Sequence, residues 1–190
     1  YYPPYRNVSI QGGKDQYLTD LVMEKTLKFV DTVSRPFFLN YAPYAVHTPI
    51  HPVKNLLEKY SEKPSWNGQD NPEYATMVEN LDRNIGLLIS KLEKKNILNN
   101  TLIIFTSDNG GLYGITKQHP LRAGKGSYYE GGIRVPVFFV LKDKIRANSK
   151  NDIPVTNIDL FPTILEYAGI KKESVKLDGT SLTPLLEDKS

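Results

Sequence analysis

Apolar residues recur at helical spacing in two long stretches of the chain. The stretches cover residues 17–34 and 71–95, and polar or charged residues fill the positions between the apolar ones. This spacing predicts two amphipathic helices. The apolar positions are Leu18, Leu21, Val22, Phe29, Val30 and Val33 in the first, and Tyr74, Met77, Val78, Leu81, Ile85, Leu88 and Leu92 in the second. Asn71-Pro72-Glu73 predicts where the second begins, because Asn caps helices and Pro and Glu suit the first turn.

Shorter helices and three apolar runs complete the pattern. Residues 53–60 and 157–168 predict short helices, and the second of these would end at Gly169. The runs at 37–42, 101–106 and 135–141 predict strands, of which the first two are buried and the second is of parallel-sheet type. Strands that alternate with helices predict a layered α/β fold with a mostly parallel central sheet flanked by helices.

Composition narrows the classes of function. The 190 residues hold 24 Lys and Arg against 21 Asp and Glu, a net charge of +3, so we do not expect nucleic acid as a partner. No apolar run approaches the roughly 20 residues that span a membrane. The absence of cysteine excludes disulfides, thiolate metal sites and a cysteine nucleophile within this chain.

The strand at 101–106 is followed by Ser107-Asp108-Asn109-Gly110-Gly111. Ligands of α/β sheets bind at the carboxyl ends of strands, and the oxygens of Asp108 and Asn109 suit Ca²⁺ or Mg²⁺. The alternative is an ordinary turn, because Asp, Asn and Gly are the commonest turn residues. Residues 107–134 form a long glycine-rich loop, and a loop of this length inside a domain is usually functional.

Lys125 lies between two glycines in this loop, and Glu130 and Arg134 follow it. Its ammonium would act as a point charge on a sulfate or phosphate that the backbone also approaches. Arg134 could pair with Glu130. The alternative is a flexible solvated loop, and the spacing of a phosphate-binding P-loop is missing.

His47 follows the run at 37–42, in the proline-rich segment 43–52. A histidine in this position could protonate a leaving group. The alternative is an ordinary surface histidine. No His-x-x-x-His or His-x-His pair exists, so zinc is not expected.

Together these pieces resemble the sulfatase family of the alkaline-phosphatase superfamily, in the style of the arylsulfatases and N-acetylgalactosamine-6-sulfatases. Six segments carry the resemblance in the family's order and cover nearly the whole chain. They are PFFLNYAPYAVHTP (36–49), NPEYATMVENLDRNIGLLISKLE (71–93), TLIIFTSDNGG (101–111), PLRAGKGSYYEGGIRVP (120–136), VTNIDLFPTILEYAGI (155–170) and LDGTSLTPLL (177–186).

The resemblance implies an alkaline-phosphatase-like layered fold and a role for each matched residue. Asp108 and Asn109 match two metal ligands, usually for Ca²⁺. Lys125 matches the lysine that contacts the sulfate group. His47 matches the histidine near the leaving-group oxygen. Glu130 and Arg134 match positions of structural support for the Lys125 loop.

One departure from the family pattern concerns the nucleophile. The family makes formylglycine from the first residue of Cys/Ser-x-Pro-Ser-Arg, and no such motif occurs in this chain, nor do the paired aspartates that supply the early metal ligands. We therefore expect residues 1–190 to be the middle-to-late part of one sulfatase catalytic domain, without its N-terminal nucleophile region and its C-terminal subdomain, and inactive alone.

The parent enzyme is then expected to hydrolyse sulfate esters of sugars or aryl alcohols in a periplasmic, extracellular or lysosomal setting. Two alternatives stay open at this point. One is a phosphodiesterase or phosphonate hydrolase of the same superfamily, and the other is a non-catalytic sulfatase-like module. The motif that holds the nucleophile would separate the first alternative from a sulfatase.

Overall fold

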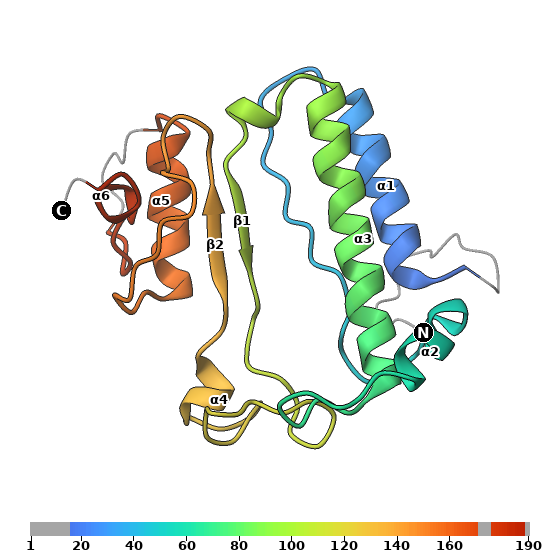
Figure 1. Ribbon diagram of the computed structural model, residues 1–190. Helices are drawn as coiled ribbons and strands as arrows, with labels where there is room; N and C mark the ends of the chain where they lie inside the picture. The colour runs from blue at the N-terminus through green and yellow to red at the C-terminus, as the bar shows by residue number, and fades with distance from the viewer. Residues whose placement is uncertain (1–15, 171–175, 189–190) are drawn as a thin grey trace, which may run out of the picture.

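The computed structural model describes residues 16–170 and 176–188. Helices α1 (Leu18–Thr32) and α3 (Pro72–Lys94) form one flank, with the short helix α2 (Lys54–Ser61) near the start of α3 (Figure 1). Strands β1 (Ile103–Thr106) and β2 (Val137–Val140) lie in the middle, and helices α5 (Leu160–Tyr167) and α6 (Thr183–Leu186) form the other flank. The arrangement is an α/β fold, as the sequence predicts.

Both long helices lie where the apolar spacing predicts them, and α3 begins as expected. The Asn71 side chain accepts a hydrogen bond from the backbone N–H of Tyr74 (3.0 Å), and Pro72 occupies the first turn. A capping asparagine satisfies one of the free N–H groups at a helix start. The prediction of the cap is therefore confirmed at the level of the bond.

The interface between α1 and α3 is more polar than the apolar stripes suggest. One oxygen of Asp20 in α1 accepts hydrogen bonds from the side-chain amides of Asn80 (2.9 Å) and Asn84 (2.8 Å) in α3. Asn80 and Asn84 are buried, and so are Met23 and Val30 on the facing helix. A buried amide is costly unless it is paired, so this cluster fixes how the two helices meet.

Tyr41 adds a third segment to this interface. Its hydroxyl is buried and has no hydrogen-bond partner within the described part of the chain. Burial, with a smaller contribution from the Asp20 carboxylate, raises the pKa of the Tyr41 phenol to about 12. The side chain therefore stays neutral at physiological pH and contributes by packing.

Helix α2 is tied to α3 by charge. Lys59 donates to the Glu79 carboxylate (2.7 Å), and Arg83 pairs with the same carboxylate from the next turn of α3. Hydrogen bonds from Lys59 and Tyr60 hold the pKa of Glu79 at about 2, although desolvation acts in the opposite direction. This carboxylate is therefore ionised throughout the physiological range.

The sheet of the described residues consists of β1 and β2, which pair antiparallel, with Phe105 opposite Phe138. The run at 101–106 thus forms a strand as predicted, but none of the β1 residues is fully buried and the pairing here is antiparallel rather than parallel. The side chains of Phe105, Phe138 and Val140 are exposed. The mostly parallel central sheet stays a prediction, since this one pair of strands does not test it.

The prediction of a buried strand at 37–42 is wrong for the described structure. These residues are extended, but no backbone hydrogen bond pairs them with another described strand, and Phe38 is 72% exposed. The segment runs between α3 and β1 (Figure 1), and Phe37 packs edge-on against Phe29 of α1 at 5.6 Å. The apolar sequence therefore packs on a helix instead of joining a ladder.

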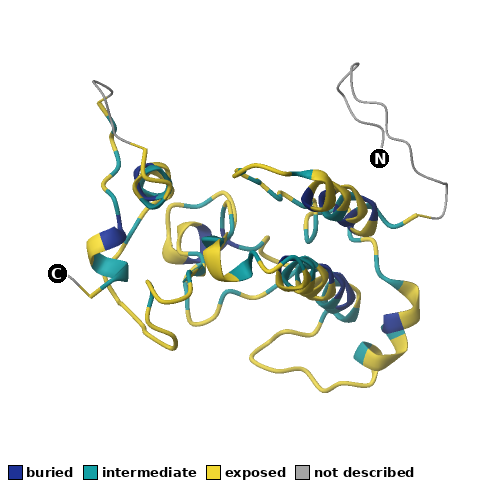
Figure 2. Ribbon diagram, turned by 90° about the horizontal axis from the view of Figure 1, so that it is seen from above, coloured by how far each residue is buried: buried dark blue, intermediate teal, exposed yellow. Residues whose placement is uncertain are grey.

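Much of the apolar surface is open to solvent. More than half of the buried residues lie in α1 and α3, and most of the ribbon in Figure 2 is exposed or intermediate. Large apolar side chains are exposed on all parts of the described chain, among them Phe38 (72%), Phe138 (59%) and Phe161 (56%). The described arrangement therefore leaves more apolar surface open than a closed domain is expected to.

Replacing Asn84 by Ala tests the polar interface. The change removes a donor to Asp20, and we expect the free energy of unfolding to fall by about 1–3 kcal/mol, as for other buried polar groups left unpaired. Urea denaturation followed by circular dichroism measures this. Ser90→Ala, on the exposed side of the same helix, serves as the control and should change stability by less than about 0.5 kcal/mol. Equal effects of the two variants would contradict the assignment.

Candidate functional site

Asp108 and Asn109 lie directly after β1, where the chain leaves the sheet. Asp108 is exposed, and one of its oxygens accepts the backbone N–H of Asn109 (2.9 Å). The side-chain nitrogen of Asn109 donates to the carbonyl of Gly110 (2.9 Å). The side-chain oxygen of Asn109 takes no part in that bond. The pair therefore presents carboxylate and amide oxygens, the ligand types that Ca²⁺ and Mg²⁺ prefer.

These two residues fit part of a metal site. Ca²⁺ takes six to eight oxygen ligands, and Mg²⁺ takes about six. Within residues 16–170 and 176–188, no group of three or more His, Cys, Asp or Glu side chains could hold a metal ion. Asp108 and Asn109 can thus supply two ligands, and a full coordination sphere needs further oxygens.

Backbone hydrogen bonds at Gly110, Gly111 and Gly132 join the end of β1 to the loop that carries Lys125 (residues 120–134, the Lys125 loop). We call this set of bonds the glycine contact. Gly110 N–H donates to the Gly132 carbonyl (2.9 Å), and Lys125 N–H donates to the Gly111 carbonyl (2.9 Å). A Cβ on Gly110 would lie 1.8 Å from the oxygen of Gly131. Only glycine allows backbones to approach this closely.

Lys125 and His47 meet across 78 residues of sequence. The Lys125 ammonium lies 2.8 Å from Nε2 of His47, and Nδ1 of His47 lies 2.6 Å from the Thr48 carbonyl oxygen. Because a carbonyl oxygen only accepts hydrogen bonds, Nδ1 carries a proton and Nε2 accepts from the ammonium. The structure therefore brings together a cation and an oriented imidazole that the sequence singled out separately.

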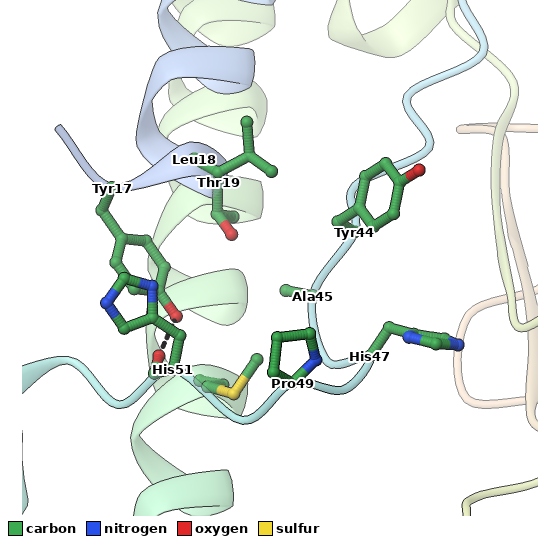
Figure 3. A pocket seen from close by; sticks show the side chains of 9 residues that line it. Tyr17, Leu18, Thr19, Tyr44, Ala45, His47, Pro49 and His51 are labelled. Atoms are coloured by element: carbon green, nitrogen blue, oxygen red, sulfur yellow. Dashed lines mark hydrogen bonds between the residues drawn. The ribbon is translucent and has the colours of Figure 1, made fainter. Parts of the chain in front are cut away.

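A shallow pocket lies behind His47 (Figure 3). Tyr17, Leu18, Thr19, Tyr44, Ala45, His47, Pro49, His51 and Met77 line it. The His47 ring points away from the pocket, whereas His51 lies on the opposite side, where the Tyr17 hydroxyl donates to its carbonyl oxygen (2.7 Å). The two histidines therefore belong to different surroundings, and only His47 reaches Lys125.

Glu130 and Arg134 pair with each other, as the sequence suggested. Glu130 opens the single-turn helix α4 (Glu130–Ile133), and its carboxylate lies 3.4 Å from Arg134. Both side chains are well exposed, so this ion pair contributes at most about 1 kcal/mol. The glycine contact is the stronger observed link between this segment and the rest of the loop.

Two residues that shape the site received no role of their own from the sequence: Gly131, which was only part of a motif, and Gln69. Gly131 packs its backbone against the carbonyls of Arg122 and Ala123. Gln69 in the loop before α3 uses its side-chain amide to bind the backbone N–H and carbonyl of Lys117 and to accept from the Thr116 hydroxyl. The doubled glycines are a local signal of close backbone approach, but no local pattern marks Gln69.

Comparison with known proteins assigns the chain to a family. The family model described as Sulfatase matches residues 1–170. The chain therefore belongs to the sulfatase family. Solved structures of sulfatases also match its fold.

Curated relatives agree with this assignment. A protein named Sulfatase from Formosa agariphila is 38% identical, with 94% of this chain and 35% of the relative covered. The human N-acetylgalactosamine-6-sulfatase is 30% identical over 89% of this chain and 32% of its own length. The chain spans about a third of the length of the curated relatives it matches.

A solved structure gives the same picture. The structure of Ps i-CgsB in complex with k-i-k-neocarrahexaose matches with a TM-score of 0.82 and 38% identity, covering 94% of this chain and 40% of that one. A structure of the putative sulfatase yidJ from Bacteroides fragilis matches with a TM-score of 0.78 at 21% identity, which supports the fold alone.

Replacing Gly110 by Ala tests the glycine contact. The new methyl group would overlap the Gly131 carbonyl, so the Lys125 loop must separate from the end of β1. We expect the free energy of unfolding to fall by more than about 2 kcal/mol, and proteolysis within 112–130 to become faster. Gly86→Ala is the matched control, since a Cβ there meets nothing within 4 Å. If the Gly110→Ala protein were as stable and as resistant to proteolysis as this control, the result would contradict the proposed contact.

Proposed function

We propose that the protein carrying this chain hydrolyses sulfate esters and that Lys125 and His47 act directly on the substrate. The observation that carries the proposal is the 2.8 Å contact between Lys125 and His47 in a chain of the sulfatase family. The contact brings an anion-binding cation to a group that can transfer a proton. Both residues are exposed, so a substrate can reach them.

Lys125 holds the sulfate group in this proposal. Its backbone N–H is fixed on the Gly111 carbonyl, so the root of the side chain lies close to the end of β1. An ammonium placed on a sulfate oxygen stabilises the negative charge that builds up on that oxygen during ester cleavage. The lysine therefore orients the group to be transferred and lowers the barrier.

His47 supplies a proton to the leaving alcohol. The bond from Nδ1 to the Thr48 carbonyl fixes the ring, and Nδ1–H can keep this bond whether or not Nε2 carries a proton. Nε2 is then the atom that faces the substrate once the sulfate has drawn Lys125 away. A positioned histidine of this kind contributes about 10²–10⁴ in rate as a general acid.

Asp108 and Asn109 hold a divalent cation, Ca²⁺ or Mg²⁺, with ligands from elsewhere in the longer protein. When bound, the cation polarises a sulfate oxygen as a Lewis acid. The two residues are carried to the Lys125 loop by the glycine contact, which keeps the cation side and the lysine side of the site in a fixed relation. Glu130 and Arg134 support the far end of that loop.

We also propose that this chain is the middle-to-late part of a single catalytic domain with a mostly parallel sheet. The open surface of the described residues and the coverage of about a third of the relatives support this. The formylglycine nucleophile would lie in the rest of that domain, made from either Cys or Ser. The protein is proposed to act in a periplasmic, extracellular or lysosomal compartment.

Sulfated glycans are the proposed substrates. The support is the similarity to Ps i-CgsB, whose solved structure holds k-i-k-neocarrahexaose. Nucleic acid is not proposed as a partner. No helix of the described residues is long and apolar enough to cross a bilayer.

Removal of the two side chains tests the mechanism in the complete gene product. We expect Lys125→Ala to lower kcat on an aryl sulfate about 10²–10³-fold, as for the loss of other charge-stabilising donors. His47→Ala should lower it more on substrates with poor leaving groups than on an activated aryl sulfate, because only the former need a proton. Lys142→Ala, a change of an exposed lysine after β2, is the control.

The same assay separates the proposal from its alternatives. Hydrolysis of aryl phosphate or phosphonate esters, with no hydrolysis of aryl sulfate, would replace it by phosphoester chemistry. Binding of sulfated sugars without turnover would indicate a non-catalytic module. Full activity of Lys125→Ala on aryl sulfate would remove Lys125 from the mechanism.

The 190 residues alone should not turn over a sulfate ester. They contain no cysteine and no Cys/Ser-x-Pro-Ser-Arg motif from which formylglycine could form. We expect no release of aryl alcohol above the uncatalysed rate after purification from a host that makes formylglycine. Turnover by these residues, abolished by Lys125→Ala, would contradict the assignment of the nucleophile to another part of the domain.

A further inference from the structure

The loop that follows the metal pair carries exposed aromatic and cationic side chains beside the Lys125 loop. Tyr113 is 70% exposed, and the Lys117 ammonium lies over its ring, 5.7 Å from the centroid. A single exposed aromatic residue needs no explanation. Three further observations distinguish this one: its contact with the Lys125 loop, a clamp on its own loop, and the local charge.

Tyr113 borders the residue before Lys125. A Cβ on Gly124 would lie 3.2 Å from the backbone nitrogen of Tyr113 and 3.4 Å from its Cβ. The backbone N–H of Lys125 donates a hydrogen bond to the carbonyl of Gly111. The backbone at Tyr113 and the backbone at Lys125 therefore lie side by side. The Tyr113 side chain therefore leaves the backbone next to the proposed sulfate-binding lysine.

A tight hairpin clamps the loop that presents Tyr113. Asn67 and Gly68 both have positive φ (50° and 75°), and Trp66 and Gln69 exchange backbone hydrogen bonds across them. This is the pattern of a type I′ turn. The Gln69 side chain donates to the Lys117 carbonyl (2.7 Å) and accepts from Lys117 N–H (3.2 Å). The clamp fixes the backbone from which the Lys117 side chain extends.

The hairpin also carries an aromatic side chain of its own. Trp66 is 74% exposed and stands one residue before the turn. A Cβ on Gly68 would lie 3.2 Å from Cγ of Lys117, so the hairpin and the lysine stem are in contact. Two exposed aromatic residues thus stand on two loops that are bonded to each other.

The local charge matches an anionic ligand. Residues 110–134 contain four cationic side chains, Lys117, Arg122, Lys125 and Arg134, and one acid, Glu130. This net charge of +3 equals that of the whole chain. A region of one sign beside a binding site attracts ligands of the opposite sign.

We infer that Tyr113, Lys117 and Trp66 form a sugar subsite next to the cleaved sulfate, which takes a neighbouring residue of a sulfated oligosaccharide. Tyr113 and Trp66 stack on the apolar C–H faces of sugar rings, for which flat, exposed aromatic surfaces are suited. Lys117 binds a second sulfate as a point charge. The inference rests on the proposed function, since it names the substrate region around the same site.

Two substrates separate this subsite from the catalytic residues. In the complete gene product, we expect Tyr113→Ala and Lys117→Ala each to raise KM for a sulfated carrageenan hexasaccharide about five- to tenfold. Their kcat/KM for 4-nitrophenyl sulfate should stay within about twofold, because that ester has no second sugar. Tyr113→Phe keeps the ring and should behave as the unaltered protein.

Phe161→Ala and Lys142→Ala are the matched controls, since both change exposed side chains outside the loops of the subsite. Unchanged hexasaccharide KM in Tyr113→Ala and Lys117→Ala, or an equal loss on both substrates, would overturn the subsite. If the unaltered protein hydrolyses neither ester, the proposed function is wrong. In that case, calorimetry with the sulfated and the desulfated hexasaccharide tests the subsite separately. The subsite requires that the protein binds the sulfated form more tightly and that Lys117→Ala weakens this binding.

Discussion

The close approach of backbones at the glycine contact is the constraint on which the site depends. The chain leaves β1 after Thr106 and reaches β2 only at Val137, with a long glycine-rich loop and the short helix α4 between them. The path of a loop of that length is set by the contacts that it makes with itself and with the rest of the protein. The bonds from Gly110 to Gly132 and from Lys125 to Gly111 close it onto the strand end. Any side chain at Gly110 would occupy the space of a carbonyl, so the absence of a Cβ is what lets the proposed metal side and lysine side share one site.

Much of the helical architecture could be predicted from the sequence because helix signals are local. The Asn71 cap, the start at Pro72 and the stop at Gly169, which has φ of 68°, all follow from the chemistry of one or two residues. The apolar runs located β1 and β2 but not their pairing, which depends on partners distant in sequence. The segment 37–42 has a strand's composition and lacks a strand's partner. Periodicity alone also gave no sign that Asn80 and Asn84 are buried, since it counts them as polar and therefore outward-facing.

The candidate site shows the same division between local and distant information. Lys125 and His47 could be singled out from neighbouring glycines and prolines, but their contact spans 78 residues and is visible only in the folded chain. The tautomer of His47 is likewise a product of the fold, because it is set by the Thr48 carbonyl. Gln69 had no signal at all, since one amide side chain in a polar loop resembles any other. Residue types identify chemistry, whereas the fold decides which of them cooperate.

The exposed apolar side chains of the two-stranded sheet have a consequence for the life of the protein in the cell. Phe105 and Phe138 stand opposite each other with their rings 5.8 Å apart, on a face open to solvent, and β1 has one edge without a described partner. Surfaces of this kind recruit strands from other molecules while a chain is being made. Pairing with strands of other molecules therefore competes with folding at this face for as long as it stays open.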